Sequence, residues 1–260
     1  MRQSQFSRQV AELERWFGVK LLDRATSPST PTGEACGIAR MADGFLRDLE
    51  QVREHAQGGR KTVTIGAGER MILGYLIPWS ARSKTGDCRL VYQNLTSREI
   101  QAELVARRVD IGVMRSDRCP PGFECRKLPP MRMACWMPKK TAAAVRKWKD
   151  LSNIPLVMLE GQGRFNSWVG GRAATEGIAL DVAIACSTWT QVIDAMNAFG
   201  MAGFVPEDLT RQLHAGFASV ALPGLAIYAD DYSLVWDKRQ TKARAELAEL
   251  VRRLTRKPAV

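Results

Sequence analysis

Residues 1–24, MRQSQFSRQVAELERWFGVKLLDR, contain the pattern that decides the fold of the N-terminal part. The apolar side chains are spaced four, three and four residues apart and therefore share one helical face: Phe6, Val10, Leu13 and Phe17. Gly18 follows as a residue that can adopt the left-handed conformation that ends a helix. Residues 21–22 then favour a short strand, and residues 26–29, which include a proline, favour a turn.

A second helix is predicted from about residue 31 to residue 57. Thr30 is the expected N-cap, and Pro31 fits the first helical position because that position needs no N–H donor. Apolar residues repeat along this helix at spacings of four and three: Ile38, Ala42, Phe45, Leu49, Val52 and Ala56. This heptad seam favours dimerisation over packing on the same chain, because charged residues fill the rest of the surface. The segment GGRK at 58–61 breaks the helix and acts as a linker.

The order of helix, short hairpin, long helix and hinge resembles the LysR-type transcriptional regulators. Residues 3–24 look like their recognition helix and the start of the wing, and TPTGEA at 30–35 looks like the start of their linker helix. The family pattern Q-S-x-x-S-R-Q is present as Gln3, Ser4, Ser7, Arg8 and Gln9. The resemblance implies a winged helix-turn-helix whose recognition helix enters the major groove of double-stranded operator DNA.

The polar side chains of this segment suit contacts with DNA. Glutamines can pair with base edges, arginine with guanine or phosphate, and serine hydroxyls with phosphate oxygens. The candidate DNA-binding residues are Gln3, Ser4, Gln5, Ser7, Arg8, Arg24 and Thr26, the last two lying in the wing. Without the resemblance a solvated helix face is the better interpretation of these residues; with it, DNA contact is favoured.

Two features depart from the family pattern. Relatives carry two further helices before this segment, so the apolar stripe of residues 6–17 would face water. We favour the hypothesis of a start codon assigned too late, because Met1 stands where the family often has valine and a GTG start would be read as methionine. The competing explanation is a real truncation with impaired DNA binding. In the wing, Ser29 replaces the hydrophobic residue that usually precedes the capping threonine.

From residue 61 onward, predicted strands and helices alternate, which is typical of parallel α/β sheets. This part resembles the LysR effector domain, itself similar to type 2 periplasmic binding proteins. The pattern that carries the resemblance comprises Ser97, Ile100, Leu104, Val109, Asp110, Ile111 and Gly112, with Arg108 in place of the usual glycine. MAGFVPEDL at 201–209 also resembles a family segment.

The resemblance divides the chain into a partial winged helix-turn-helix at 1–30, a linker and dimerisation helix at 31–58, and an effector-binding domain at 61–260. It implies two lobes, the first at about 61–137 and 226–260 and the second at about 138–225. A small effector would bind between them, where strand ends and helix N-termini converge.

The candidate effector-binding residues lie at predicted strand ends and helix starts: Gly68, Glu69, Thr96, Ser97, Gly163, Arg164, Thr188, Trp189, Thr190 and Phe204. Each of these can equally be a helix cap or a core residue, and only the group favours a pocket. Glu69 stands where many relatives have a small or hydroxylated residue. Its carboxylate would repel an acidic effector or pair with Arg70 or Arg164, which weakens the usual expectation of a carboxylic acid ligand.

Composition adds weaker constraints. The formal net charge is +11, but residues 1–60 contribute only +1 and residues 61–260 contribute +10, so charge alone says little about DNA. The six cysteines form no C-x-x-C pair and are expected as reduced, mostly buried thiols without a metal. No run of 18 apolar residues and no signal-peptide core occur, which places the protein in the cytoplasm.

The favoured function is a DNA-binding transcriptional regulator that responds to a small-molecule effector as a homodimer or homotetramer. The alternative is a truncated cytoplasmic small-molecule-binding protein with impaired DNA binding. An enzyme is the least favoured class, because two scattered histidines and no nucleophile motif offer no catalytic constellation. No cofactor is expected.

Overall fold

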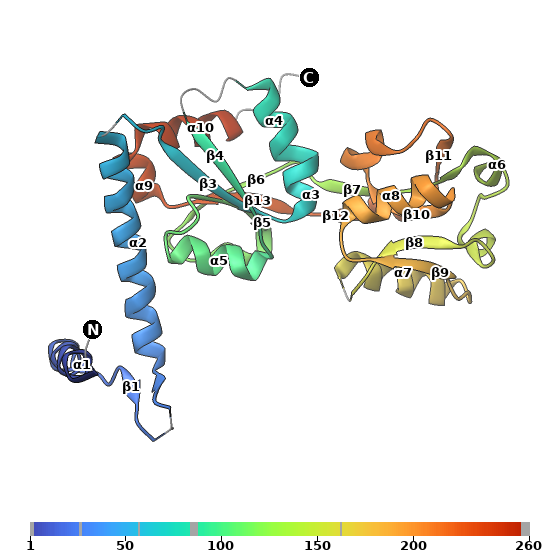
Figure 1. The fold of residues 1–260 in the computed structure, drawn as a ribbon. Coiled ribbons are helices and arrows are strands. Elements are labelled where there is room, and N and C mark those ends of the chain that lie inside the picture. The colour runs from blue at the N-terminus through green and yellow to red at the C-terminus, as the bar shows by residue number, and fades with distance from the viewer. Residues whose placement is uncertain (1–2, 26–27, 57, 84–87, 162, 256–260) are drawn as a thin grey trace.

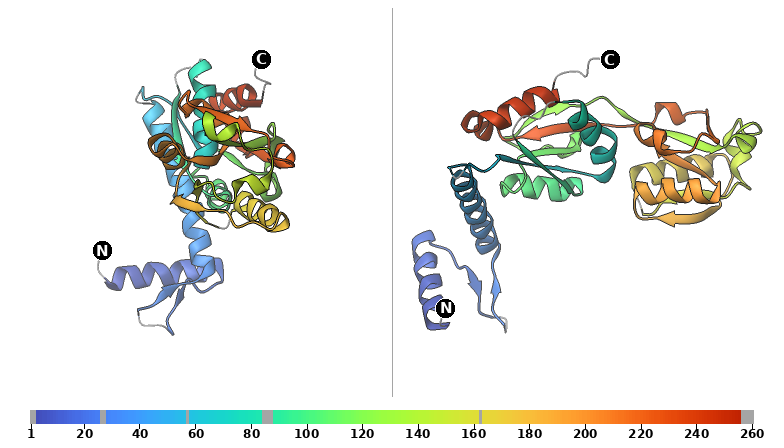
Figure 2. Two further views of the ribbon diagram at one scale, coloured as in Figure 1. Left: turned by 90° about the vertical axis from the view of Figure 1, so that its right-hand side faces the viewer. Right: turned by 45° about the horizontal axis from the view of Figure 1, so that its top comes forward.

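The computed structural model describes residues 3–25, 28–56, 58–83, 88–161 and 163–255. An N-terminal arm projects from a body that consists of two α/β lobes in a row (Figure 1). In a second view the first helix and a small hairpin lie at the far end of the arm, well away from both lobes (Figure 2).

The arm contains the helices that the sequence predicts. Helix α1 (Gln3–Phe17) ends at Gly18, whose φ of 70° is left-handed, and α2 (Gly33–Ala56) is the long second helix. Between them β1 (Leu22–Asp23) and β2 (Thr30–Pro31) form an antiparallel pair. The predicted cap at Thr30 is wrong, because that residue lies in β2. Thr32 is the cap instead: its Oγ1 accepts from the Ala35 N–H at 3.2 Å.

Lobe I is built on a five-stranded sheet in the order β4-β3-β5-β13-β6. Its strands are β3 (Thr62–Ala67), β4 (Arg89–Asn94), β5 (Ile111–Arg115), β6 (Glu124–Lys127) and β13 (Tyr232–Trp236). Its helices are α3 (Glu69–Met71), a π-helix (Ile72–Leu76), α4 (Ile77–Arg82), α5 (Ser97–Val105), α9 (Lys238–Ala243) and α10 (Ala245–Thr255).

Lobe II is built on a second sheet in the order β11-β7-β10-β8-β9, with β12 paired to β7. Its strands are β7 (Met131–Pro138), β8 (Leu156–Leu159), β9 (Val182–Cys186), β10 (Ala202–Pro206), β11 (Phe217–Val220) and β12 (Ala229–Asp230). Its helices are α6 (Lys139–Ala142), α7 (Arg164–Thr175) and α8 (Trp189–Phe199).

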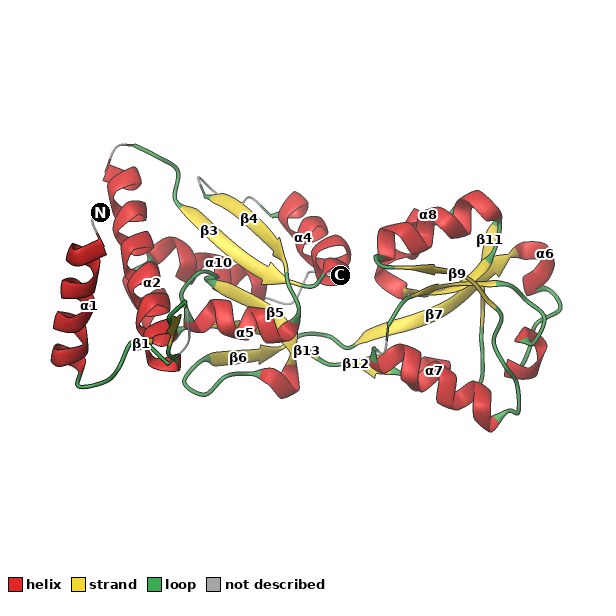
Figure 3. Cartoon of the chain, turned by 60° about the horizontal axis from the view of Figure 1, so that its bottom comes forward, coloured by secondary structure: helices red, strands yellow, loops and turns green. Residues whose placement is uncertain are grey.

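Two connections join the lobes, one entering β7 and one leaving β12 (Figure 3). The expected end of lobe I at residue 137 therefore falls inside a lobe II strand, and residues 226–230 likewise lie with lobe II. The sheets are mixed rather than purely parallel, because β7 and β13 each pair antiparallel with both of their neighbours in sheet order. Both are the strands that follow a crossing between the lobes.

Each lobe has its own core. In lobe I, Val63, Ile65 and Leu234 pack beneath Leu247 and Leu250 of α10. In lobe II, β7, β8 and β10 pack against an aromatic group in which the rings of Trp148 and Phe204 stack with centroids 5.8 Å apart. The two cores are linked at two places, because Met131 of β7 packs in the lobe I core and Leu73 of the π-helix packs against lobe II.

The segment after α5 that carries the family pattern, residues 109–112, holds neighbouring elements of lobe I together. Asp110 is 6% exposed; its Oδ2 accepts from the Thr64 N–H at 2.8 Å and its other oxygen pairs with Arg244. At Gly112 a Cβ would lie 2.6 Å from Ile100 Cγ2, so glycine lets α5 approach the sheet. Arg108 stands where the family pattern has glycine, and Arg107 beside it has a positive φ of 56°.

The cysteine prediction is partly wrong. Cys119 and Cys125 form a disulfide that closes the loop before β6. Cys135 and Cys186 are buried free thiols, Cys36 is free and half-buried, and Cys88 is half-buried and lies outside the disulfide. Burial raises the pKa of the Cys135 thiol to about 12, so this sulfur is a protonated core group at neutral pH.

Candidate functional site

A cavity of about 310 Å³ lies between the lobes, where the carboxyl ends of β3, β4, β5 and β8 meet the start of α8. Lobe I contributes Gly68, Glu69, Arg70, Met71, Asn94, Arg115 and Tyr232, and Asp230 comes from β12 of lobe II. Lobe II contributes Met133, Leu159, Glu160, Gly163, Arg164, Phe165, Asn166, Ser187, Thr188 and Trp189. We call this cavity the cleft.

Glu69 crosses the cleft. Its carboxylate accepts from the backbone N–H of Trp189 at 2.8 Å, from the backbone N–H of Thr190 at 3.3 Å, and from the Thr190 hydroxyl at 2.9 Å. It therefore occupies the start of α8, where free N–H groups attract negative charge. Neither pairing that the sequence suggested, with Arg70 or with Arg164, is the one that forms.

Arg164 and Asp117 form a second bridge between the lobes. Asp117 lies in a short 3₁₀ turn (Ser116–Arg118) directly after β5, and Arg164 is the first residue of α7. The hydrogen bond from Arg164 lowers the pKa of the Asp117 carboxyl, and both side chains remain substantially exposed. This bridge can therefore break and re-form at low cost.

Arg70 lies beneath the cleft and is 6% exposed. Its Nη2 donates to the Arg132 carbonyl at 3.0 Å, and its guanidinium lies 3.6 Å from an oxygen of Asp208 and 3.9 Å from one of Asp230. Asp208 belongs to lobe II and also packs against Gly74, where an added Cβ would clash with the Asp208 carboxylate. Arg70 is thus a buried cation of lobe I that pairs with Asp208 and Asp230 of lobe II.

Six of the ten predicted effector residues line the cleft: Gly68, Glu69, Gly163, Arg164, Thr188 and Trp189. The other four lie elsewhere. Thr96 and Glu99 form a reciprocal cap of α5, and Ser97 Oγ accepts from the Arg115 N–H at 3.3 Å. Thr190 contacts Glu69, whereas Phe204 is 1% exposed in the lobe II core. Phe204 is therefore a core residue, as an inward-facing position of a central strand should be.

Sequence reasoning missed several lining residues, and for some a signal was available. Asn94, Arg115 and Glu160 end or directly follow strands of the two sheets. Asp230 and Tyr232 reach the cleft only because the second connection passes beneath it. Those two could not be placed without the topology.

Helix α1 presents a polar face to solvent. Ser4, Gln5, Ser7 and Arg8 are exposed, as is Arg24 in the hairpin; the side chain of Gln3 and all of Thr26 lie outside what the structure describes. Glu14 ties the helix to the hairpin: it accepts from the Leu21 N–H at 2.8 Å, and this bond lowers the pKa of its carboxyl. The apolar stripe is also largely exposed, with Phe6 at 49% and Leu13 at 46%.

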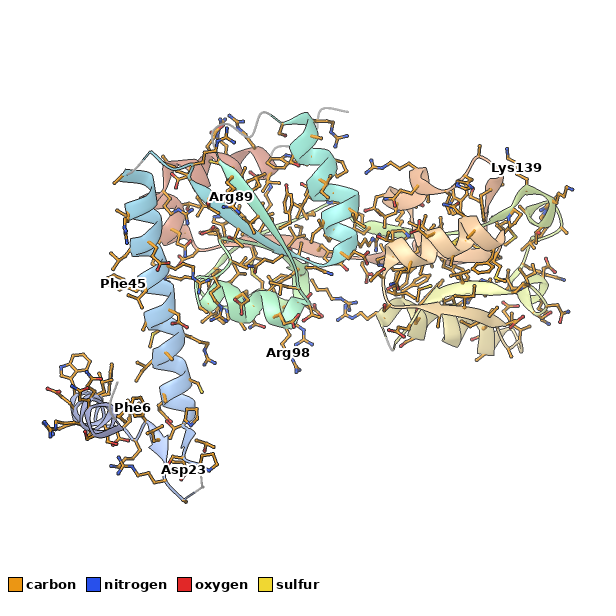
Figure 4. The ribbon with its side chains drawn as sticks, in the orientation of Figure 1. Phe6, Asp23, Phe45, Arg89, Arg98 and Lys139 are labelled. Atoms are coloured by element: carbon orange, nitrogen blue, oxygen red, sulfur yellow. A yellow bond between two sulfur atoms is a disulfide. The ribbon has the colours of Figure 1, made fainter. Side chains whose placement is uncertain are left out.

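The seam of α2 faces away from lobe I. Phe45 is 59% exposed, Leu49 is 49% and Val52 is 67%, and Figure 4 shows Phe45 on the outer side of the helix. Gly44 lies on the opposite side, where a Cβ would come within 2.8 Å of the Ala106 carbonyl oxygen. Ala42 is exposed and Ile38 half-buried. The predicted dimerisation residues thus form an open apolar strip.

Within the described ranges, no group of three or more His, Cys, Asp or Glu side chains could hold a metal ion. In that same part of the chain, no helix has the length and apolar character needed to cross a membrane.

The family model for the LysR substrate binding domain matches residues 56–256, which is most of the chain. The chain belongs to the LysR family of regulators. A second family model, the bacterial regulatory helix-turn-helix protein of the lysR family, matches residues 1–35. The protein is a LysR-type transcriptional regulator with an effector-binding domain. A search of curated proteins found no match.

Solved LysR-family structures share the fold at low sequence identity. Full-length CbnR in complex with its target DNA is 20% identical with a TM-score of 0.61, and the match covers 98% of this chain and 91% of that one. A full-length point mutant of OxyR from Pseudomonas aeruginosa is 18% identical with a TM-score of 0.63, covering 97% and 86%. Full-length BenM is 18% identical with a TM-score of 0.54, covering 98% and 88%.

Proposed function

We propose that this LysR-type regulator reads promoter DNA with the N-terminal half of α1 and changes its DNA affinity when a small molecule binds in the cleft. The proposed division assigns residues 1–30 to DNA contact, 31–58 to dimerisation and 61–260 to effector binding. The proposal needs no catalytic step and places the protein in the cytoplasm, where bacterial DNA lies.

The observation that carries the proposal is the cleft, because its walls come from both lobes and are joined by reversible polar bridges. Glu69 reaches from lobe I to α8, and Arg164 reaches from lobe II to Asp117. Arg211 of lobe II also donates to the Leu73 carbonyl at 3.3 Å. A ligand that competes for these bridges or adds to them would shift the relative position of the lobes.

The DNA-contact half of the proposal is supported by the exposed Ser4, Gln5, Ser7 and Arg8 on consecutive turns of α1. Such side chains can reach base edges and phosphates when a helix lies in a major groove. CbnR, a protein of the same fold, has been solved with its target DNA. The alternative of a ligand sensor without DNA contact has less support, because the helix-turn-helix family model matches residues 1–35.

The test is fluorescence anisotropy with labelled DNA from the region upstream of the protein's own gene. Arg8→Ala should weaken binding by about 1–3 kcal/mol, the range for loss of one specific base contact. Arg40→Ala, which removes an exposed arginine from α2, is the matched control and should change the affinity little. Equal affinities for wild type and Arg8→Ala would contradict the assignment of α1 as the reading helix.

A further inference from the structure

The charges around the cleft are satisfied unevenly, and this indicates which ligands the cleft accepts. The inference rests on the proposed function, since it takes the cleft as the effector site. It concerns the chemical class of the effector, which the fold does not specify.

The place where an anion would bind is already filled by the chain itself. Thr188 caps α8 by accepting from the Gln191 N–H at 3.2 Å. The N–H groups of the two residues after Thr188, Trp189 and Thr190, both donate to Glu69. A carboxylate ligand could use the start of α8 only by displacing Glu69 and by approaching a carboxylate of the same charge.

Most of the positive side chains of the cleft are paired as well. Arg70 is held by Asp208, Asp230 and the Arg132 carbonyl, and Arg164 pairs with Asp117. Arg115 has no carboxylate within 4.0 Å among the described residues, although it lies close enough to Asp117 to help lower the pKa of that carboxyl. Among the residues that the structure describes, two of the three arginines lining the cleft are therefore paired with carboxylates of the chain itself.

Two carboxylates that line the cleft are not paired with a cation of the described residues. Glu69 accepts hydrogen bonds only from neutral N–H and O–H groups, and Glu160 lines the cleft without a cation within 4.0 Å in the described part of the chain. Trp189, Phe165 and Tyr232 supply aromatic surface in the same cavity. Negative charge beside aromatic rings attracts an organic cation through both charge and ring quadrupole.

We propose that the cleft binds a small organic cation, a primary ammonium group on an apolar body, and discriminates against carboxylates because Glu69 already occupies the start of α8.

The test uses three probes that share one ring and differ in charge: benzylamine, which is protonated at neutral pH, benzyl alcohol and benzoate. Their affinities for the full protein are measured by calorimetry without DNA. Wild type should bind benzylamine most tightly and benzoate least. Glu69→Gln keeps an oxygen that can accept from the Trp189 N–H but removes the charge. It should weaken benzylamine binding about tenfold and strengthen benzoate binding.

Glu99→Gln is the matched control. Like Glu69, Glu99 is a lobe I carboxylate that accepts a hydrogen bond at the start of a helix, but that helix is α5 and Glu99 does not line the cleft. It should leave the order of the three probes unchanged. Benzoate binding to wild type as tightly as benzylamine would overturn the proposal. So would the absence of any preference among the probes, including no binding at all, or a preference that survives Glu69→Gln unchanged.

The failure of this inference can be told apart from the failure of the proposed function. The charge preference is measured without DNA, and the Arg8→Ala test is measured without ligand. A protein that prefers benzylamine and ignores promoter DNA would keep the inference and contradict the proposed function. A protein that binds promoter DNA and prefers benzoate would support the proposed function and contradict the inference.

Discussion

Arg107 lies at the turn between α5 and β5 with a φ of 56°. A side chain in this left-handed region is strained because Cβ crowds the following carbonyl, and glycine avoids the strain. The turn also lies under α2, since a Cβ at Gly44 would come within 3.3 Å of the Arg107 Cβ. The residue thus retains an unfavourable backbone conformation where the arm meets lobe I.

The left-handed conformation costs a non-glycine residue roughly 1–2 kcal/mol, more than the roughly 0.5–1 kcal/mol of chain entropy that glycine costs. Replacing Arg107 with glycine should therefore stabilise the protein, as measured by the free energy of unfolding in urea. Arg107→Ala is the control, because it removes the same side chain but keeps a Cβ in the strained region. If both variants changed stability equally, the effect would come from the side chain and not from the backbone.

The pKa of the Asp117 carboxyl depends on the ion pair with Arg164 that joins the lobes. Because Arg164 donates to it, the pKa of this carboxyl lies below its ordinary value of 3.8. The sign follows from linkage: a carboxyl whose folded pKa is depressed stabilises the bridged state above the ordinary pKa and loses that contribution as pH falls through the lowered value.

An NMR titration of the Asp117 carboxyl should give a pKa below 3.8 in wild type. In Arg164→Gln the main cause is removed, so the pKa should return toward the ordinary value. A titration that is the same in both proteins would show that the two side chains do not meet in solution.

At this scale sequence reasoning reached only part of the site. It placed Gly68, Glu69 and Trp189 correctly at the cleft, because strand ends and helix starts converge in such folds. It could not choose the partner of Glu69, since that depends on how close α8 of lobe II comes to α3 of lobe I. It assigned Phe204 to the cleft because the side chain's direction from its strand was not known.

At the scale of the elements, α2 has two faces with different roles. Gly44 lies against lobe I, and the strip containing Phe45, Leu49 and Val52 is open. An exposed apolar strip at heptad spacing is the geometry that pairs two helices into a coiled coil. We therefore keep the prediction that α2 pairs with its copy in a second chain.

Phe45→Asp should convert a dimer or larger assembly into smaller species, because two carboxylates would face each other in the seam. Light scattering coupled to size exclusion measures the mass directly. Arg40→Asp, which changes an exposed position of the same helix outside the seam, should leave the assembly intact. An unchanged mass for Phe45→Asp would place the interface on another surface.

Most elements were predictable because their hydrophobic patterns are regular. Helices α1 and α2 lie close to where the sequence places them, and strands and helices alternate from residue 61 onward as expected. Helix α7 was not predicted, because its segment contains Gly170 and Gly171, which lower helix propensity. The helix is stabilised by burial of Phe165 and Val169 in the lobe II core, which the sequence does not show. The antiparallel direction of β7 and β13 was missed, because each of these strands enters its sheet from a connection between the lobes.

In the molecule as a whole, the two lobes are joined by two connections, by polar bridges across the cleft and by apolar contacts of Met131 and Leu73. The arm carries α1 far from the cleft. In the proposed function, a ligand in the cleft would influence DNA contact by moving the lobes and, through them, the α2 helices that we propose to pair. In the proposed function, effector binding between the lobes and DNA contact at the tip of the arm are therefore far apart in the molecule.

The most direct test of this account is the affinity of the protein for its upstream promoter DNA, compared with a scrambled duplex over a range of salt concentrations. The account predicts tighter binding to the promoter and a steep fall in affinity with salt, by about 0.9 in log–log slope for each phosphate contacted. Equal affinity for the two duplexes, or no binding to either at low salt, would contradict it.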